Sequence, residues 1–260
     1  MRDRKEILSR LGIVFVSRSE SDELIGWGTK VRTNPKPLQQ QVHSLAESGC
    51  RYIVISHENS LGKPFNQDSG GLYNKSAEQI NAFAEALSNY DLTFIYYIRR
   101  QWEFVESYYI QTVHQGSRKT FKEWYTSIGR SANLSWRPLV ENLRTIQGGS
   151  TIIKDFGTLV ENGQEWYLKD FFECFIDTES IPPVEYKSKR NISVGETGLK
   201  MLRAANKFTD TAAERKLLRK FFQQYFNNLN YPRPSLLNPE EQMRIKEKYA
   251  SELVELLKNN

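Results

Sequence analysis

This chain of 260 residues has few of the side chains that build metal sites and disulfide scaffolds. It contains two cysteines, Cys50 and Cys174, which lie far apart in the sequence, and three histidines (His43, His57 and His114) that are not spaced as metal ligands. A zinc site or a disulfide framework needs more thiols at closer spacing. We therefore expect no metal, and we interpret both cysteines as buried free thiols.

The sequence also lacks long apolar runs and dense charge. No stretch approaches the roughly 20 apolar residues that span a bilayer, and the segment Met1–Glu6 lacks the apolar core of a secretion signal. We therefore expect no membrane span and a cytoplasmic location. The net charge is +5 with basic residues spread along the chain, whereas nucleic-acid binders show a dense basic stripe. This mild excess of positive charge is compatible with an anionic small ligand, and we expect no nucleic acid as a partner.

Four short apolar runs predict buried strands, and helical patterns lie between them. The runs are Ile13–Val16, Arg51–Ser56, Asp91–Ile98 and Ser150–Lys154. Helices are predicted in the three intervals, at about 37–48, 76–88 and 103–115, whereas 17–37 and 59–74 are predicted to be loops. Strands that alternate with helices are typical of an α/β fold with a parallel sheet flanked by helices.

After Lys154 the sequence shows helical patterns alone. These are Trp166–Phe175, Gly198–Lys207, Ala212–Asn227 and Pro239–Leu257. We expect a single domain over residues 1–260, with an α/β sheet part at 1–155 and a helical C-terminal part at 156–260.

The residues that follow the strands are the candidate site residues, because ligands of an open parallel sheet bind outside the carboxyl ends of its strands. His57 and Glu58 follow the second strand, and either could accept a proton from a hydroxyl group. Arg99 follows the third strand, and Ser107 comes eight residues later in the next helix. Together Arg99 and Ser107 could hold a phosphate. The alternative is that Arg99 pairs with a nearby acid and that Ser107 packs against a neighbour.

Residues 94–109, with the sequence FIYYIRRQWEFVESYY, carry a family resemblance. The segment resembles the 3′-phosphate-binding segment of the sulfotransferases that use 3′-phosphoadenosine 5′-phosphosulfate. More narrowly, it is similar to bacterial sulfotransferase-like proteins. Three other segments resemble segments of the family and occur in the same order along the chain as in the family. They are Ile53–Glu58, Lys189–Ser193 and Pro234–Glu241. The resemblance covers most of the chain, from about Arg4 onward.

The resemblance implies a nucleotide-binding fold of the P-loop class and transfer of a sulfuryl group to a hydroxyl or amine of a carbohydrate or similar acceptor. Arg99 and Ser107 would hold the 3′-phosphate of the donor. Glu58 stands at the family's glutamate position and would be the base, with His57 as the competing candidate. Three later residues would close over the nucleotide: Arg190, Asn191 and Ser193. No metal is required for the reaction.

One departure from the family pattern affects the activity that we expect. The family begins with a strand and a glycine-rich loop with a Lys-Thr or similar pair, and this loop holds the 5′-phosphosulfate. Here residues 4–11 resemble the helix that follows that loop, so the first strand and the loop are expected to be missing. Either the printed start is late or the loop is lost. A lost loop would favour a non-catalytic relative that binds a nucleotide or an anionic glycan.

Overall fold

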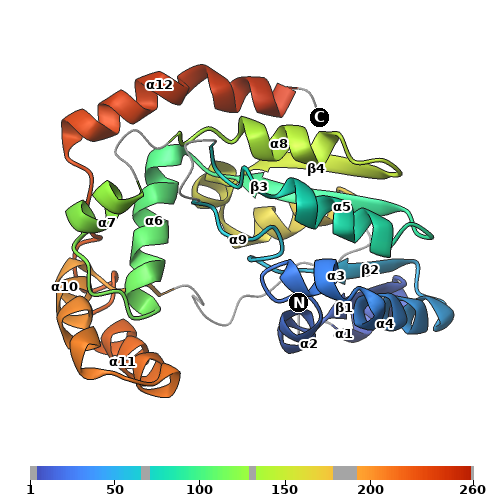
Figure 1. Cartoon of the computed structure of the whole chain (residues 1–260), viewed down its shortest axis with the longest axis horizontal. Helices are drawn as coiled ribbons and strands as arrows, with labels where there is room; N and C mark the ends of the chain where they lie inside the picture. Colours follow the sequence, from blue (N-terminus) through green and yellow to red (C-terminus); the bar gives the residue numbers. More distant parts are fainter. Residues whose placement is uncertain (1–4, 66–70, 129–132, 178–191, 259–260) are drawn as a thin grey trace. The chain divides into compact units, whose positions relative to one another are not determined.

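The computed structural model describes residues 5–65, 71–128, 133–177 and 192–258 (Figure 1). The chain folds into two compact units whose segments alternate along the sequence. Unit 1 comprises Met1–Ile98, Asn133–Pro182 and Val254–Asn260, and unit 2 comprises Arg99–Ala132 and Pro183–Leu253.

Unit 1 contains the strands and the helices that flank them. In chain order these elements are α1 (Lys5–Arg10), β1 (Ile13–Val16), α2 (Arg18–Leu24), α3 (Thr29–Thr33), α4 (Lys36–Glu47), β2 (Tyr52–Ile55), α5 (Ala77–Ala86), β3 (Leu92–Ile98), α8 (Arg137–Arg144), β4 (Gly149–Asp155) and α9 (Gly157–Phe172). Unit 2 is built from helices. They are α6 (Gln101–His114), α7 (Phe121–Ser127), α10 (Glu196–Ala205), the 3₁₀ turn η3 (Asn206–Phe208), α11 (Ala212–Tyr225) and α12 (Pro239–Lys258), whose last turn belongs to unit 1.

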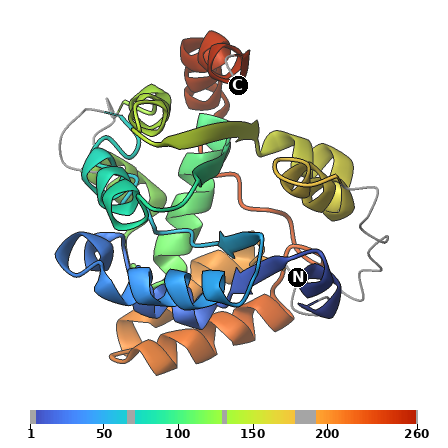
Figure 2. The same cartoon turned by 90° about the vertical axis from the view of Figure 1, so that its right-hand side faces the viewer.

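The strands form two parallel pairs, where the sequence predicts one sheet (Figures 1 and 2). β1 pairs with β2 from Ile13↔Tyr52 onward, and β3 pairs with β4 from Leu92↔Gly149 onward. The four predicted strands are all present, and the mixed α/β class with parallel strands between helices is confirmed. The prediction of a single sheet is wrong because, within the described residues, β2 and β3 exchange no main-chain hydrogen bonds.

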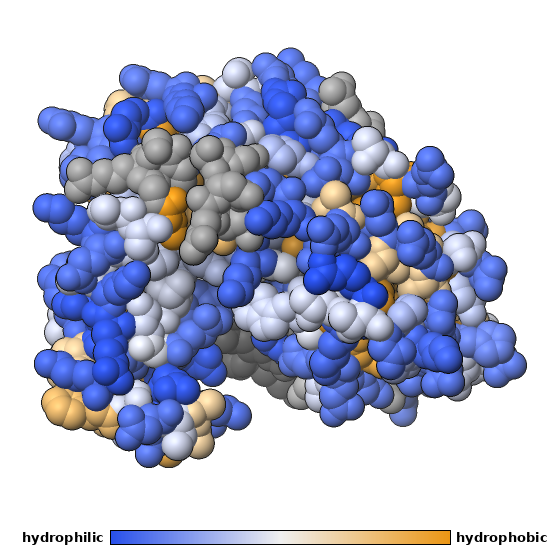
Figure 3. All heavy atoms as spheres, viewed as in Figure 1, coloured by the Kyte–Doolittle hydropathy of each residue, from blue (hydrophilic) through white to orange (hydrophobic). Residues whose placement is uncertain are grey.

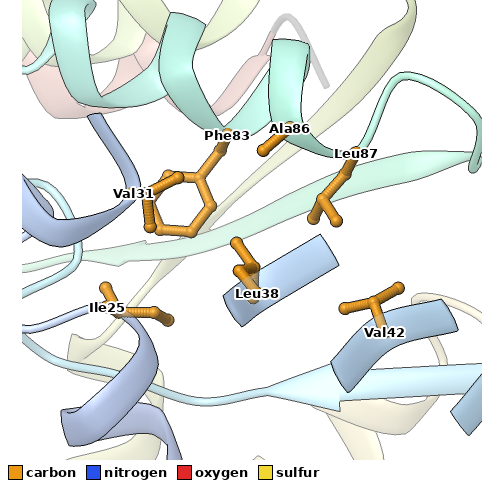
Figure 4. Close-up of a cluster of buried hydrophobic side chains, with 7 residues drawn as sticks. All are labelled: Ile25, Val31, Leu38, Val42, Phe83, Ala86 and Leu87. Atoms are coloured by element: carbon orange, nitrogen blue, oxygen red, sulfur yellow. The ribbon is translucent and has the colours of Figure 1, made fainter. Parts of the chain in front are cut away.

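An apolar cluster covers one face of β2 and β3 together (Figure 4). Its buried members are Ile25, Val31, Leu38, Val42, Phe83, Ala86 and Leu87. Ile53 and Ile55 of β2, and Leu92 and Phe94 of β3, pack against this cluster. Full burial of one such side chain contributes about 1.5–3 kcal/mol, so the cluster holds α2 to α5 on this face of both strand pairs.

Helix α9 lies on the opposite face of both strand pairs. Phe172 of α9 forms a cluster with Leu8 of α1 and Ile13 of β1, and Val54 of β2 packs against that cluster. On the β3–β4 pair, the Tyr97 hydroxyl donates a hydrogen bond of 2.7 Å to Asp170 of α9. β2 and β3 are therefore covered on both faces by the same layers of helices.

The segment 17–37 forms two short helices, α2 and α3, where the sequence predicts a loop. Ser17 caps α2 in a reciprocal box: its hydroxyl accepts from the Glu20 main-chain N–H at 3.3 Å, and the Glu20 carboxylate accepts from the Ser17 N–H at 2.8 Å. Such Ser-x-x-Glu boxes mark helix starts. The prediction was wrong because helices of 7 and 5 residues are too short to show an apolar period.

Polar contacts join distant segments within unit 2. The Asn206 amide donates to the carbonyl oxygens of Val113 at 2.8 Å and Ser117 at 3.0 Å. Several apolar side chains of this unit are exposed, including Phe208 at 81% and Leu217 at 68%. Apolar surface is visible over α10 and α11 in the space-filling view (Figure 3). Unit 2 thus combines a core with polar contacts and a partly apolar surface.

Candidate functional site

A cavity of about 490 Å³ opens at the carboxyl ends of β1 and β2 in unit 1. Its lining includes residues 13–18 and 56–59, together with Leu8 and Ser9 of α1 and Glu20 and Asp22 of α2. β1 itself lines the cavity, and the segments that follow β1 and β2 supply its polar groups Arg18, Asp22, His57 and Glu58. The position matches the general place of ligand sites in open parallel sheets.

His57 lies in the wall of this cavity, with its side chain 4% exposed. Its Nε2 lies 2.9 Å from Oδ1 of Asp22, and its Nδ1 accepts from the main-chain N–H of Asn59 at 3.2 Å. Because Nδ1 is an acceptor, the ring proton of the neutral imidazole belongs on Nε2, which donates to Asp22. In this arrangement His57 has no ring lone pair left with which to accept a proton from a substrate.

Glu58 lines the same cavity but faces solvent, with its side chain 69% exposed. Its carboxylate lies 3.9 Å from Arg18 Nη2, and Arg18 also lies 3.9 Å from the Asp22 carboxylate. Exposed ion pairs of this length contribute at most about 1 kcal/mol. Glu58 can therefore leave Arg18 at little cost and is open to a substrate hydroxyl.

The loop after β2 is held in place by a close approach of main chains. Gly28, between α2 and α3, has φ +77°, and a Cβ at this position would collide with the main-chain oxygen of Ser60. L side chains rarely adopt this φ, and the collision adds a second restriction. Glycine at residue 28 thus allows the loop that carries His57 and Glu58 to pack against the start of α3.

Arg99 and Ser107 belong to unit 2, at the start of α6 and on it. Arg99 is half-buried and follows the last residue of β3 directly, while Ser107 is exposed. Ser107 is six residues into α6, which places it about 9 Å along the helix axis from Gln101. The Arg99 side chain would have to run along α6 for both residues to hold one phosphate.

The structure describes only part of the segment 190–193, which the sequence predicts to close over the nucleotide. Arg190 and Asn191 lie outside the described residues. The main-chain N–H of Ser193 donates to the Asn228 side chain at 3.1 Å, and the Ser193 carbonyl accepts from the Asn228 N–H at 2.9 Å. Ser193 is therefore attached to the chain that follows α11.

Sequence reasoning missed Arg18 and Asp22, which connect Glu58 and His57 to α2. Both lie in a segment that was predicted to be a loop. The capping pattern Ser17–Glu20 was the signal that could have shown that a helix starts here and that Arg18 and Asp22, four residues apart, share one of its faces.

The described residues contain no group of three or more His, Cys, Asp or Glu side chains that could hold a metal ion. Both cysteines are unbridged and half-buried, and burial raises the pKa of the Cys174 thiol. In the part of the chain that the structure describes, no helix has the length and apolar character needed to cross a membrane. Comparisons of this chain with protein-family models, curated proteins and solved structures found no match.

Proposed function

We propose that this protein binds 3′-phosphoadenosine 5′-phosphosulfate and transfers its sulfuryl group to a hydroxyl or amine of a carbohydrate or similar acceptor. The observation that supports this most is the cavity at the carboxyl ends of β1 and β2, whose lining includes the exposed carboxylate of Glu58. The resemblance of residues 94–109 to the 3′-phosphate segment of sulfotransferases supplies the substrate class.

In this proposal Glu58 is the base that accepts the proton of the acceptor group. Proton transfer by a positioned side chain typically contributes about 10²–10⁴-fold to a rate. His57 is a positioning residue, because both of its ring nitrogens are engaged by Asp22 and Asn59. Its contacts hold the segment from which Glu58 projects.

Arg99 and Ser107 contribute to donor binding as phosphate ligands, the guanidinium through paired hydrogen bonds and the hydroxyl through one more. Ser193 and the undescribed residues Arg190 and Asn191 are proposed to cover the nucleotide. The donor is a substrate here, and no metal takes part in the proposed reaction.

Calorimetry with 3′-phosphoadenosine 5′-phosphate tests the donor part of the proposal. We expect the wild type to bind, Arg99→Ala to weaken binding by about tenfold to 100-fold, and Ser107→Ala by less. Arg100→Ala is the matched control, because Arg100 lies 3.7 Å from Glu103 on α6 and next to Trp102. A folded wild type that does not bind, or an equal loss in both arginine variants, would refute the proposed 3′-phosphate site.

Turnover with the phosphosulfate donor and a panel of hydroxyl and amine acceptors tests the chemical part. Glu58→Gln should lower kcat by about 100-fold or more with little change in KM. Glu20→Gln serves as the control, since Glu20 lines the same cavity but is occupied in the cap of α2. Equal rates in wild type and Glu58→Gln would exclude Glu58 as the base.

A non-catalytic binder of a nucleotide or an anionic glycan is the second candidate function. Its support is the exposure of Glu58, because a carboxylate whose side chain is 69% exposed is surrounded mainly by water and does not lie in a closed site from which water is expelled. Binding of the nucleotide without any transfer to the acceptor panel would favour this candidate over the enzyme.

A further inference from the structure

Helix α11 of unit 2 carries apolar side chains on its outer face. Leu217, Phe221 and Tyr225 follow one another at intervals of four residues, which places them on one face of the helix over about 12 Å. They are 68%, 48% and 54% exposed, whereas Phe222, through which α11 packs into unit 2, is 5% exposed. A surface helix that packs on one side usually has a polar outer face. The packing of unit 2 therefore does not account for the outer apolar stripe.

The exposed apolar surface continues at both ends of α11. Phe208, in the turn between α10 and α11, is 81% exposed, and Leu229, just after α11, is 58% exposed. Along the helix, the rings of Phe221 and Tyr225 lie 5.0 Å apart between their centres. The space-filling view shows apolar surface at this end of unit 2 (Figure 3). Apolar surface of this kind marks a place where a protein meets another protein or a membrane.

The same part of the chain carries most of the net positive charge. Lys and Arg occur along the whole sequence, but they are balanced by acids almost everywhere else. Residues 196–229, from the start of α10 to the end of the apolar surface, contain seven Lys or Arg and three Asp or Glu, and the whole chain contains 36 and 31. Four of the five net positive charges of the protein therefore belong to this segment.

Lysine side chains lie directly beside the apolar ones. The Nζ atom of Lys207 is 5.7 Å from the centre of the Phe208 ring. Lys216 and Lys220, both exposed, directly precede Leu217 and Phe221 in α11. Lysine can lay its methylene stem along apolar surface and keep its ammonium group in a polar layer. The outer face of α11 thus offers apolar contact and positive charge together.

A basic hollow of unit 2 adjoins this face. It is lined by Arg118, Lys119, Lys122, Glu123 and Thr126. The loop that begins the hollow touches the turn before α11, because the Asn206 amide donates to the carbonyl oxygen of Ser117 at 3.0 Å. It also touches α11 itself, because a Cβ at Gly116 would collide with the Arg215 side chain. Three more cations therefore border the start of α11.

We propose that this part of unit 2 binds the surface of a bilayer that contains anionic lipids, with α11 parallel to the membrane plane. The name α11 surface is used here for Phe208, Leu217, Phe221 and Tyr225 together with Lys207, Lys216 and Lys220. Amphipathic helices of this composition bury their apolar side chains at the boundary between headgroups and acyl chains, and their lysines pair with lipid phosphates. The inference does not depend on the proposed enzymatic function.

Charge and shape favour a bilayer over a second copy of the chain. A symmetric dimer would bring two copies of the same positive segment together, and like charges repel each other. Phe208 stands out from the surface at 81% exposure. A fluid bilayer receives a protruding ring without a matching pocket, whereas the core of a protein interface needs close shape complementarity.

Sedimentation of the full chain with lipid vesicles gives the first test. Vesicles of phosphatidylcholine with about a third phosphatidylglycerol should bind at least about tenfold more tightly than vesicles of phosphatidylcholine alone. Binding to the anionic vesicles should weaken at least about tenfold when NaCl rises from about 0.05 to 0.5 M, because salt screens the attraction.

Substitutions on the α11 surface give the second test. Phe208→Ser removes apolar contact and Lys220→Glu reverses a charge, and each should weaken binding to the anionic vesicles by about tenfold. The matched controls are Met243→Ser and Lys248→Glu, which change exposed residues of α12 in the same way. The controls should change binding less than about twofold. Circular dichroism shows that each variant is folded, which is expected because all four side chains are exposed.

Four results would overturn the proposal. The folded wild type fails to bind anionic vesicles, neutral vesicles bind it equally well, or the two α12 controls lose as much binding as the variants of the α11 surface. The fourth is a wild type that stays off the vesicles and self-associates in a way that Phe208→Ser abolishes. That result would assign the α11 surface to a second copy of the chain.

Discussion

Unit 1 and unit 2 differ in the kind of side chain that joins their segments. In unit 1 the strands meet the helices through apolar clusters, and Ile98 and Ile153 in the strands are fully buried. In unit 2 buried or half-buried polar groups connect distant segments: the Glu106 carboxylate accepts from the N–H groups of Leu236 and Leu237 at 2.7 and 2.9 Å. Apolar burial is non-directional, whereas each polar contact needs one geometry.

This difference predicts that the two units respond to different perturbations. Unit 1 should be most sensitive to lost apolar volume, because its stability depends on burial. Unit 2 should be most sensitive to pH and to loss of an acceptor, because an unpaired buried polar group is costly. Four predictions test this contrast, starting with the largest effect.

Ile153→Ala in β4 should lower the free energy of unfolding by about 2–5 kcal/mol, because its side chain is fully buried and the substitution leaves a cavity. Ile53→Ala in β2 is the matched control, and we expect less than about half of that loss because Ile53 is partly exposed. Urea denaturation measures both. Equal losses would contradict the dependence of the stability of unit 1 on buried apolar volume.

The stability of unit 2 should fall in acid because of His114. Burial lowers the pKa of His114 to about 4, and the positive charge of Arg219 acts in the same direction. The unfolded imidazole titrates near 6.5, so between these values the unfolded state binds more protons. The free energy of unfolding should therefore decrease as the pH falls from about 6.5 to 4, by up to about 3 kcal/mol.

Denaturation curves across that pH range measure the effect of His114. His114→Gln should flatten the dependence on pH, whereas His43→Gln should preserve it, since the His43 side chain is 67% exposed. A wild-type slope that survives in His114→Gln would assign the acid sensitivity to other groups.

Glu106→Ala should destabilise unit 2 by about 2 kcal/mol, because it leaves the N–H groups of Leu236 and Leu237 without their acceptor. Glu106→Gln keeps an acceptor oxygen and should recover most of the loss. Glu103→Ala on the same helix removes a half-exposed ion pair of 3.7 Å with Arg100 and should change stability by less than about 1 kcal/mol. Hydrogen exchange at residues 236 and 237 reports the contact directly, and unchanged protection in Glu106→Ala would contradict it.

Arg18→Ala should have the smallest effect, below about 1 kcal/mol, because its ion pairs with Asp22 and Glu58 are exposed and 3.9 Å long. Thermal denaturation at low and high salt measures this difference. A loss of more than about 2 kcal/mol would show that Arg18 is part of the structural core of unit 1 and that Glu58 cannot leave it freely.

Much of the fold is predictable from local pattern, and the failures have local causes. The four strands were found because runs such as Ile13–Val16 are apolar throughout, which is typical of strands covered on both faces. The start of α9 was missed, because Gly163 interrupts that helix with φ 86° and ψ 179° and hides its first turns from a periodic pattern. Short helices and kinks carry too few residues for a period to show.

The candidate site was predictable in part. The rule that ligands bind beyond the carboxyl ends of parallel strands led to His57 and Glu58, and both line the cavity there. The choice between them as base was open in the sequence. It depended on contacts with Asp22 and Asn59, and hydrogen-bond partners 35 residues apart leave no mark in a sequence pattern.

The sequence by itself determined the four strands and most of the longer helices of this protein, because apolar periodicity acts over neighbouring positions. It also determined that the strands are parallel, through the helices that separate them. Only the tertiary structure decided that β2 and β3 do not pair with each other in the described part of the chain, that His57 is held by Asp22, and that polar contacts join the segments of unit 2. These features depend on main-chain edges and directional hydrogen bonds between distant residues, which exist only after the chain has folded.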